Sequence, residues 1–253
     1  MSAKVQDRFK ILAASLRRVR HHPHDAEAIH KLRVAIRRFT QALRVFQDSF
    51  EPAHIRKIRR RLRKLMELCG VARNCDIALE VLEAAGVPAD KPLQRQLRRV
   101  RSRAERDLVM RLAEKDARAD LRRWRTWLRS PAAAVAPSNV LPKLAREFLK
   151  TGNAAVRAEA SFSQMHQFRL LVKRYRYTLE ILGGPERRIE LLRRIQELLG
   201  AINDCVTTAA LLIECDVKTA DLRRIKTALS RLLANRTAEF RVAWSKDRRQ
   251  HKA

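Results

Sequence analysis

Apolar residues recur along most of this chain at the three- and four-residue spacing of an amphipathic helix. When residues 30–46 are placed on a helical wheel, Leu32, Ile36 and Phe39 gather on one side and basic residues gather on the other. The same spacing predicts helices over 3–20, 25–48, 53–84, 92–129, 139–151, 155–182, 186–214 and 218–244, with breaks around Gly70 and Gly200. The pattern therefore predicts an all-α protein.

Three segments of the first half return in the same order in the second half. HKLRVAIRRF at 30–39 resembles HQFRLLVKRY at 166–175, an offset of 136 positions. LRKLMELCGVARNC at 62–75 resembles LRRIQELLGAINDC at 192–205, an offset of 130, and LRRVR at 97–101 resembles LRRIK at 222–226, an offset of 125. Similar segments in a conserved order indicate a duplicated unit.

The duplication predicts two pseudo-symmetric halves, each resembling a four-helix bundle. The stretch PAAAVAPSN contains two prolines and several small residues, which interrupt helices. We therefore predict a first bundle at 1–130, a linker at 131–139 and a second bundle at 140–253.

Composition agrees with this fold class and indicates the cellular compartment of the protein. The chain has 253 residues, of which 46% are hydrophobic, and it contains only 6 glycines. Its four cysteines, Cys69, Cys75, Cys205 and Cys215, lie in apolar helical stretches without CxxC spacing, so the sequence indicates neither a zinc site nor a disulfide framework. The sequence has no 18-residue apolar run, and we expect a cytoplasmic protein without a membrane partner.

The net charge of the chain gives the strongest indication of its binding partner. Lys and Arg total 56 against 27 Asp and Glu, which leaves a net charge of +29. Self-repulsion on this scale favours a polyanionic partner. Arginines outnumber lysines by 42 to 14, and a planar guanidinium matches phosphate oxygens two at a time, although a GC-rich coding sequence would produce the same bias.

The repeated segments concentrate this charge on the polar face of two helices. Two candidates of the first helix, Arg33 and Arg37, have no acidic residue three or four positions away, so a ligand would explain them better than a solvated helix face. The leading candidates for anion binding are His30, Arg33, Arg37, Arg38, Arg44, His166, Arg169, Lys173 and Arg174, and a second group consists of Lys64, Arg73 and Arg194. A helix-packing role for the two histidines remains the alternative.

Other basic and polar residues have structural explanations. Arg63, Arg176 and Arg193 each precede a glutamate by four positions and are expected to form ion pairs within their helices. HHPHD at 21–25 matches no defined metal site, and its Asp25 is typical of a helix N-cap. We therefore predict no metal and no cofactor.

Together these motifs make the chain similar to the conserved histidine α-helical domain, or CHAD, family. HKLRVAIRRFTQALRVF, LCGVARNCD, HQFRLLVKRYRYTLEIL and LLGAINDC resemble the family's motifs in the right order. The resemblance implies two helical bundles whose facing surfaces form a basic central groove that binds inorganic polyphosphate. The chain departs from the pattern at Asn74, where members carry aspartate, and lacks the ExExK signature of a fused CYTH domain, so it resembles a stand-alone member.

We therefore expect a non-enzymatic protein that binds inorganic polyphosphate, with polyphosphate granules or polyphosphate-metabolising enzymes as further partners. Non-specific nucleic-acid binding is the alternative, because the net charge alone would suffice for it. The basic faces of the two repeated helices, which we call the stripes, contain almost no aromatic residue on which a base could stack. This favours polyphosphate over single-stranded nucleic acid. An enzyme would need clustered carboxylates or an activated nucleophile, which the stripes do not supply.

Overall fold

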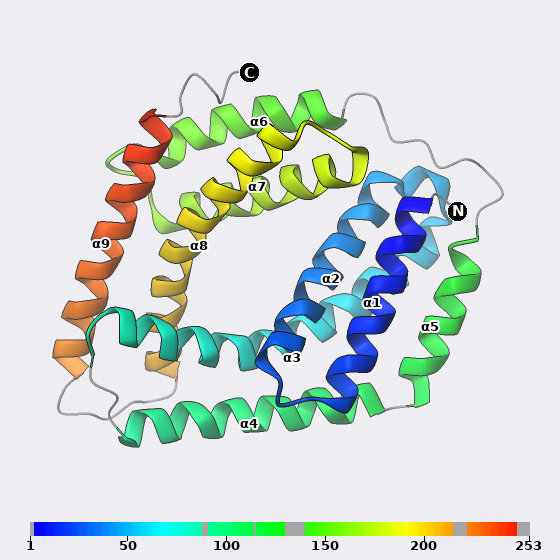
Figure 1. Cartoon of the computed structure of the whole chain (residues 1–253), viewed down its shortest axis with the longest axis horizontal. Coiled ribbons are helices and arrows are strands. Elements are labelled where there is room, and N and C mark those ends of the chain that lie inside the picture. The colour runs from blue at the N-terminus through cyan, green and yellow to red at the C-terminus, as the bar shows by residue number, and fades with distance from the viewer. Residues whose placement is uncertain (1–2, 88–90, 114, 130–139, 215–221, 247–253) are drawn as a thin grey trace. The chain divides into compact units, whose positions relative to one another are not determined.

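A computed structural model describes residues 3–87, 91–113, 115–129, 140–214 and 222–246, with side chains described for all of these except 91, 113 and 115–118. In this part of the chain the backbone forms nine α-helices, one 3-10 helix and no strand, which confirms the all-α prediction (Figure 1). The helices are α1 (Ala3–His21), α2 (Ala26–Val45), α3 (Pro52–Ala84), α4 (Lys91–Ala113), α5 (Lys115–Trp127), α6 (Val140–Ala155), α7 (Phe162–Leu182), α8 (Glu186–Glu214) and α9 (Leu222–Lys246), and η1 (Gln47–Ser49) follows α2.

The helices belong to two compact units. Unit 1 consists of Met1–Asp76 and Arg98–Ser138, and unit 2 consists of Ile77–Leu97 and Asn139–Ala253. Both α3 and α4 therefore contribute residues to each unit. The predicted linker at 131–139 lies outside the described residues, and the two-bundle division, the internal duplication and the groove stay predictions.

The structure corrects the predicted helix breaks. Both α3 and α8 run without interruption through Gly70 and Gly200. A lone glycine costs a helix only about 1 kcal/mol relative to alanine, and buried residues on both sides of each glycine hold the helix in place. The predicted helix over 155–182 instead starts at Phe162, because Ser161 and Gln164 form a capping box.

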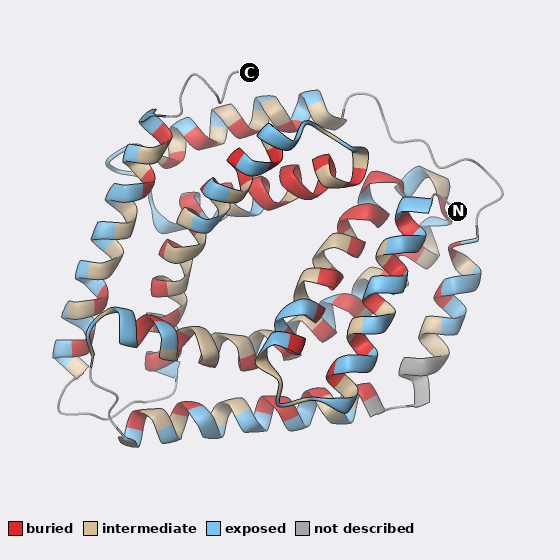
Figure 2. Ribbon diagram, viewed as in Figure 1, coloured by how far each residue is buried: buried red, intermediate tan, exposed pale blue. Residues whose placement is uncertain are grey.

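The core of unit 1 forms where α1 packs against α2. The predicted apolar face of α2 is confirmed, because Leu32, Ile36 and Phe39 are all buried. The ring of Phe9 on α1 lies 5.7 Å from the ring of Phe39. Buried positions recur along one side of each helix (Figure 2), as amphipathic packing requires.

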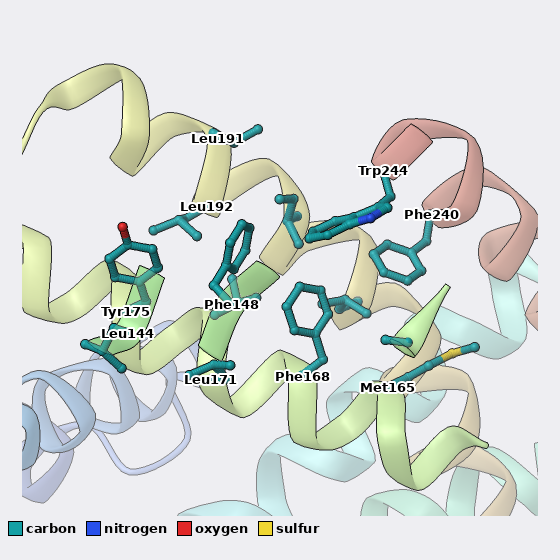
Figure 3. Close-up of a cluster of buried hydrophobic side chains, with 14 of the residues drawn as sticks. Leu144, Phe148, Met165, Phe168, Leu171, Tyr175, Leu191, Leu192, Phe240 and Trp244 are labelled. Atoms are coloured by element: carbon teal, nitrogen blue, oxygen red, sulfur yellow. The ribbon is translucent and has the colours of Figure 1, made fainter. Parts of the chain in front are cut away.

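Aromatic side chains fill the core of unit 2, where α7 packs against α6 and α8 (Figure 3). Phe148, Phe168 and Trp244 lie with ring centroids 5.3 to 5.5 Å apart, in tilted and edge-on arrangements. The indole nitrogen of Trp244 donates a hydrogen bond of 3.2 Å to Oδ1 of Asn153. Aromatic pairs of this geometry add about 0.5–1.5 kcal/mol beyond their buried area, so this cluster holds α6, α7 and α9 together.

A charge network of unit 1 ties α3 to α4. Arg101 donates to Oδ1 of Asp76 at 2.6 Å and also pairs with Glu105, which is only 2% exposed. Nδ1 of His24 lies 2.9 Å from the other oxygen of Glu105. Breaking such a network would leave acidic groups in a poorly hydrated place.

The described helices have no apolar stretch long enough to cross a membrane.

Candidate functional site

Three arginines of unit 1 act electrostatically on His30 at the predicted stripe of α2. His30, Arg33 and Arg37 follow one face of α2, and Arg73 acts on His30 from α3. The pKa of His30 lies below its ordinary value of 6.5, first because the surrounding helices remove part of its hydration, and then because the Arg73, Arg37 and Arg33 guanidinium groups disfavour a further positive charge. Glu27 opposes this shift. We call these four residues the His30 cluster.

Arg33 is the anchored member of the His30 cluster. Its Nη1 donates a hydrogen bond of 3.3 Å to the backbone carbonyl of Met66 on α3. A Cβ atom added at Gly70 would lie 3.4 Å from this nitrogen, so the missing side chain leaves room for the guanidinium against α3. Gly70 therefore allows the Arg33 side chain to approach α3, and it does not break the helix.

Nearby Cys69 is buried below the cluster. Burial raises the pKa of its thiol to about 11, although Arg33 acts in the opposite direction. The thiol therefore stays protonated at neutral pH and offers no nucleophile.

Unit 2 carries the second stripe on α7, where His166, Arg169 and Lys173 follow the same spacing. Nδ1 of His166 lies 2.8 Å from Oδ1 of Asn203 on α8, an acceptor for this ring nitrogen. Arg169 is half-buried and Lys173 is only 7% exposed. In the aligned segments, Asn203 occupies the position of Arg73. His166 of unit 2 therefore has a neutral amide as its neighbour, whereas His30 of unit 1 is near a guanidinium.

Two other leading candidates have polar partners within their own unit. Arg174 on α7 pairs with Glu147 on α6, across the α6–α7 packing. Arg44 lies 14 residues after His30, about 21 Å along the axis of α2, and donates a hydrogen bond of 3.5 Å to the side chain of Gln41. Arg38 is half-buried on α2, next to Arg37.

In the second group of candidates, Lys64 does not lie beside Arg73 on α3, and Arg194 does not lie beside Asn203 on α8. Lys64 precedes Arg73 by nine residues, and Arg194 precedes Asn203 by nine, which on a continuous helix is about half a turn out of phase. Lys64 accordingly lines a pocket with residues of α5, on the side of α3 away from Arg73. Arg194 is exposed on α8.

The predicted structural roles have mixed outcomes. The pair between Arg176 and Glu180 is confirmed, at 2.6 Å. Arg193 was assigned the wrong partner: it contacts Glu190 and Glu186, one turn and two turns before it, because the sequence offers acids in both directions along α8.

Asp25 is confirmed as the N-cap of α2, where its carboxylate accepts hydrogen bonds from the backbone nitrogens of Glu27 and Ala28. Arg18 donates to the same carboxylate, and this bond is the main reason why the pKa of Asp25 is lowered. Over the described residues, no group of three or more metal-binding side chains occurs.

Sequence reasoning missed two residues of these sites. Asn203, the partner of His166, is visible in the alignment of 62–75 with 192–205, because it occupies the position of a selected residue, Arg73. Arg101 precedes Glu105 by four positions, a spacing that indicates an ion pair within a helix, but its bond to Asp76 gave no signal, because Asp76 lies 25 residues away on another helix.

Comparison with known proteins agrees with the motifs and the fold. The family model of the CHAD domain matches residues 3–213. A comparison with curated proteins gives no match. A solved CHAD domain from the plant Ricinus communis is similar with a TM-score of 0.72 and 22% sequence identity, over 96% of this chain and 91% of that one.

The structure of PptA from Streptomyces chartreusis is similar with a TM-score of 0.68 and 20% identity, over 98% of this chain and 94% of that one. Sequence identities this low establish a shared fold and nothing finer. The family model, in contrast, covers more than half of the chain. This chain belongs to the CHAD domain family.

Proposed function

We propose that this protein binds inorganic polyphosphate without catalysis, through the His30 cluster and the stripe of His166, Arg169 and Lys173. The observation that carries the proposal is the grouping of His30, Arg33 and Arg37 on one face of α2, where Arg33 is anchored to α3 by its hydrogen bond to Met66. The pKa of His30 agrees with this grouping, since it is lowered first by burial and then by Arg73, Arg37 and Arg33. The CHAD family is a family of binding domains related to polyphosphate binding. An anion placed at this point would relieve the repulsion among these groups.

The composition of the stripes supports polyphosphate over nucleic acid. A phosphate chain has no base, so it can be bound by charge and hydrogen bonds alone. Tyr177, four residues after Lys173 on α7, is 5% exposed and has the guanidinium of Arg176 over its ring at 4.7 Å. It therefore offers no stacking surface for a base.

The acids near the stripes support binding without catalysis. Glu27, which acts on His30, lies 3.5 Å from Lys31. Near His166, the carboxylate of Asp204 accepts a hydrogen bond of 3.5 Å from Asn203. Single acids with partners of this kind do not form the carboxylate set that metal-assisted hydrolysis of phosphate chains uses.

The test is a titration of the full chain with long-chain polyphosphate by calorimetry at 0.15 M salt. We expect the double variant R37E/R73E to bind at least about tenfold more weakly, because two charge-assisted contacts of about 1.5–3 kcal/mol each are lost. The matched control R223E/R224E changes the net charge equally at two exposed positions at the start of α9. Equal losses in both variants would mean that total charge binds the ligand.

A competition experiment separates the two polyanions. Duplex DNA, added at the same phosphate concentration, should displace little labelled polyphosphate from the wild-type chain. Complete displacement would assign the protein to non-specific nucleic-acid binding instead. The salt dependence of the affinity should also flatten in R37E/R73E, by about 0.7–0.9 in the logarithmic slope for each lost contact if polyphosphate behaves as nucleic acids do.

A further inference from the structure

A second basic pocket lies in unit 1, on the side of α3 away from Arg73. It has a volume of about 390 Å³ and lies between α3 and α5. We call it the α3–α5 pocket; its lining residues include Lys57, Arg60, Lys64, Arg123, Trp124 and Trp127. Lys57, Arg60 and Lys64 stand at positions i, i+3 and i+7 of α3, so their side chains project from one face of that helix.

The charge of the α3–α5 pocket is only slightly compensated by the acids that line it in the described chain. One carboxylate, Asp120, lines the pocket, and it forms an ion pair of 3.1 Å with Arg61, both being about one-fifth exposed. This leaves the charges of Lys57, Arg60, Lys64 and Arg123 facing one space. Four cations in a concave site bind an anion of several charges better than a flat surface does, because the walls exclude part of the screening water.

Trp127 organises two of these cations. Nζ of Lys57 lies 5.8 Å from the centre of the indole ring and the guanidinium of Arg123 lies 5.9 Å from it. The ring itself stacks on His54 at 4.3 Å, with an angle of 4° between the planes. Cation–π contacts of this kind restrict the side chains before a ligand arrives, which lowers the entropic cost of binding.

A pocket lined by both leucines and arginines adjoins the α3–α5 pocket and shares Arg61, Asp120 and Trp124 with it. Its volume is about 360 Å³, and four of its lining residues are leucines: Leu16, Leu65, Leu112 and Leu121. Five arginines, among them Arg17 and Arg20, and His21 line the same space, so hydrogen-bond donors surround the leucines. The two pockets together thus offer a strongly basic part and a part that combines apolar side chains with donors.

We propose that these pockets bind a nucleoside polyphosphate, with the phosphates in the α3–α5 pocket and the base in the leucine-lined pocket. An inorganic phosphate chain has no apolar group for the leucines, and the hydrocarbon chain of an alkyl phosphate has no hydrogen-bond acceptors for Arg17, Arg20 and His21. A nucleotide supplies both, together with several negative charges. Each pocket lies within the range of about 300–1,000 Å³ that is typical of small-molecule sites.

The experiment is a titration of the full chain with ATP at 0.15 M salt, followed by calorimetry and by tryptophan fluorescence. ATP should change the fluorescence, and the change should be smaller in W127F, which keeps Trp124 in both pockets, while calorimetry still detects binding. We expect ATP to bind at least about fivefold more tightly than tripolyphosphate or adenosine, because each of these fills only one of the two pockets. ATP should also bind more tightly than decyl phosphate, whose alkyl chain offers no hydrogen-bond acceptor to the donors beside the leucines. R60E/R123E should bind ATP at least tenfold more weakly, or K64Q/R123Q in its place if that variant loses its wild-type circular dichroism.

The controls separate this site from the polyphosphate site. R37E/R73E and R223E/R224E should keep wild-type affinity for ATP. Equal losses in these variants and in R60E/R123E, or equal binding of tripolyphosphate and ATP, would overturn the nucleotide proposal and leave simple charge attraction. Tighter binding of decyl phosphate than of ATP would assign the leucine-lined pocket to an alkyl chain and would also overturn the nucleotide proposal.

Discussion

Arg33 on α2 donates a hydrogen bond to the backbone carbonyl of Met66 on α3, beside the open space left by Gly70. One basic residue of the stripe is therefore held against the neighbouring helix. This contact keeps a guanidinium close to His30 and Arg73 before any ligand binds.

Replacing Gly70 with leucine should displace this guanidinium. The new side chain would occupy the space next to Nη1 of Arg33, and we expect polyphosphate affinity to fall about three- to tenfold, up to the value of one hydrogen bond from a charged group. Gly200→Leu is the matched control, because nothing lies within 4 Å of a Cβ at that position. Calorimetric titration of both variants measures the difference, and an unchanged affinity in Gly70→Leu would contradict the role of Arg33.

Polyphosphate binding should strengthen as the pH falls through His30. Its pKa is lowered in the unbound protein, and a bound polyanion raises it, so binding takes up a proton between the two values. We expect higher affinity at pH 5.5 than at pH 7.5, and a smaller difference in His30→Asn. Affinities measured at both pH values check this, and an identical pH dependence in the variant would exclude His30 as the titrating group.

A fall in pH should have the opposite effect on folding stability, which should decrease while polyphosphate affinity increases. Because the pKa of folded His30 lies below the unfolded value, the contribution of this group is present above about pH 6.5 and is lost as the pH falls. Without polyphosphate, His30→Asn should therefore lose less stability than the wild type between pH 7.5 and pH 5.5. Urea denaturation at the two pH values measures this.

Gly152 and Gly200 should respond in opposite ways to alanine. A Cβ at Gly152 on α6 would overlap the indole of Trp244, which is buried and held by Asn153, so we expect Gly152→Ala to destabilise the chain by about 1–3 kcal/mol. Gly200→Ala meets no neighbour and should stabilise it by up to about 1 kcal/mol through helix propensity. Thermal and urea denaturation compare the two variants, and destabilisation by both would mean that α8 needs its glycine.

Arg101→Ala should destabilise unit 1. The change leaves Asp76 and Glu105 without the guanidinium that both contact, and we expect a loss of about 2–3 kcal/mol, below the value for a fully buried pair because Arg101 keeps 17% of its side-chain exposure. Exposed Arg103 on the same helix provides the control, since Arg103→Ala should cost less than about 0.5 kcal/mol. Equal effects on the free energy of unfolding would show that the network adds no stability.

Arg174→Gln should leave polyphosphate affinity within about twofold of the wild type, because this arginine pairs with Glu147 on α6. Arg169→Gln, on the stripe itself, should weaken binding by more. Calorimetric titration of both variants ranks them, and a larger loss in Arg174→Gln would mean that the pair with Glu147 opens when the ligand binds.

The sequence by itself determined the helices, their apolar faces and the stripe of His30, Arg33 and Arg37. These features depend on residues three to seven positions apart, and such local spacing survives in any helical fold. The predicted helices cover most of the observed ones, and Leu32, Ile36 and Phe39 are buried as the wheel indicates.

Only the tertiary structure decided which helix faces meet. It joined Arg73 to His30, put Lys64 on the other side of α3, paired Arg174 with Glu147 and carried α3 straight through Gly70. Each of these depends on packing between segments far apart in the chain, where the gain from buried contacts outweighs a local cost of about 1 kcal/mol. Local periodicity carries no record of such contacts.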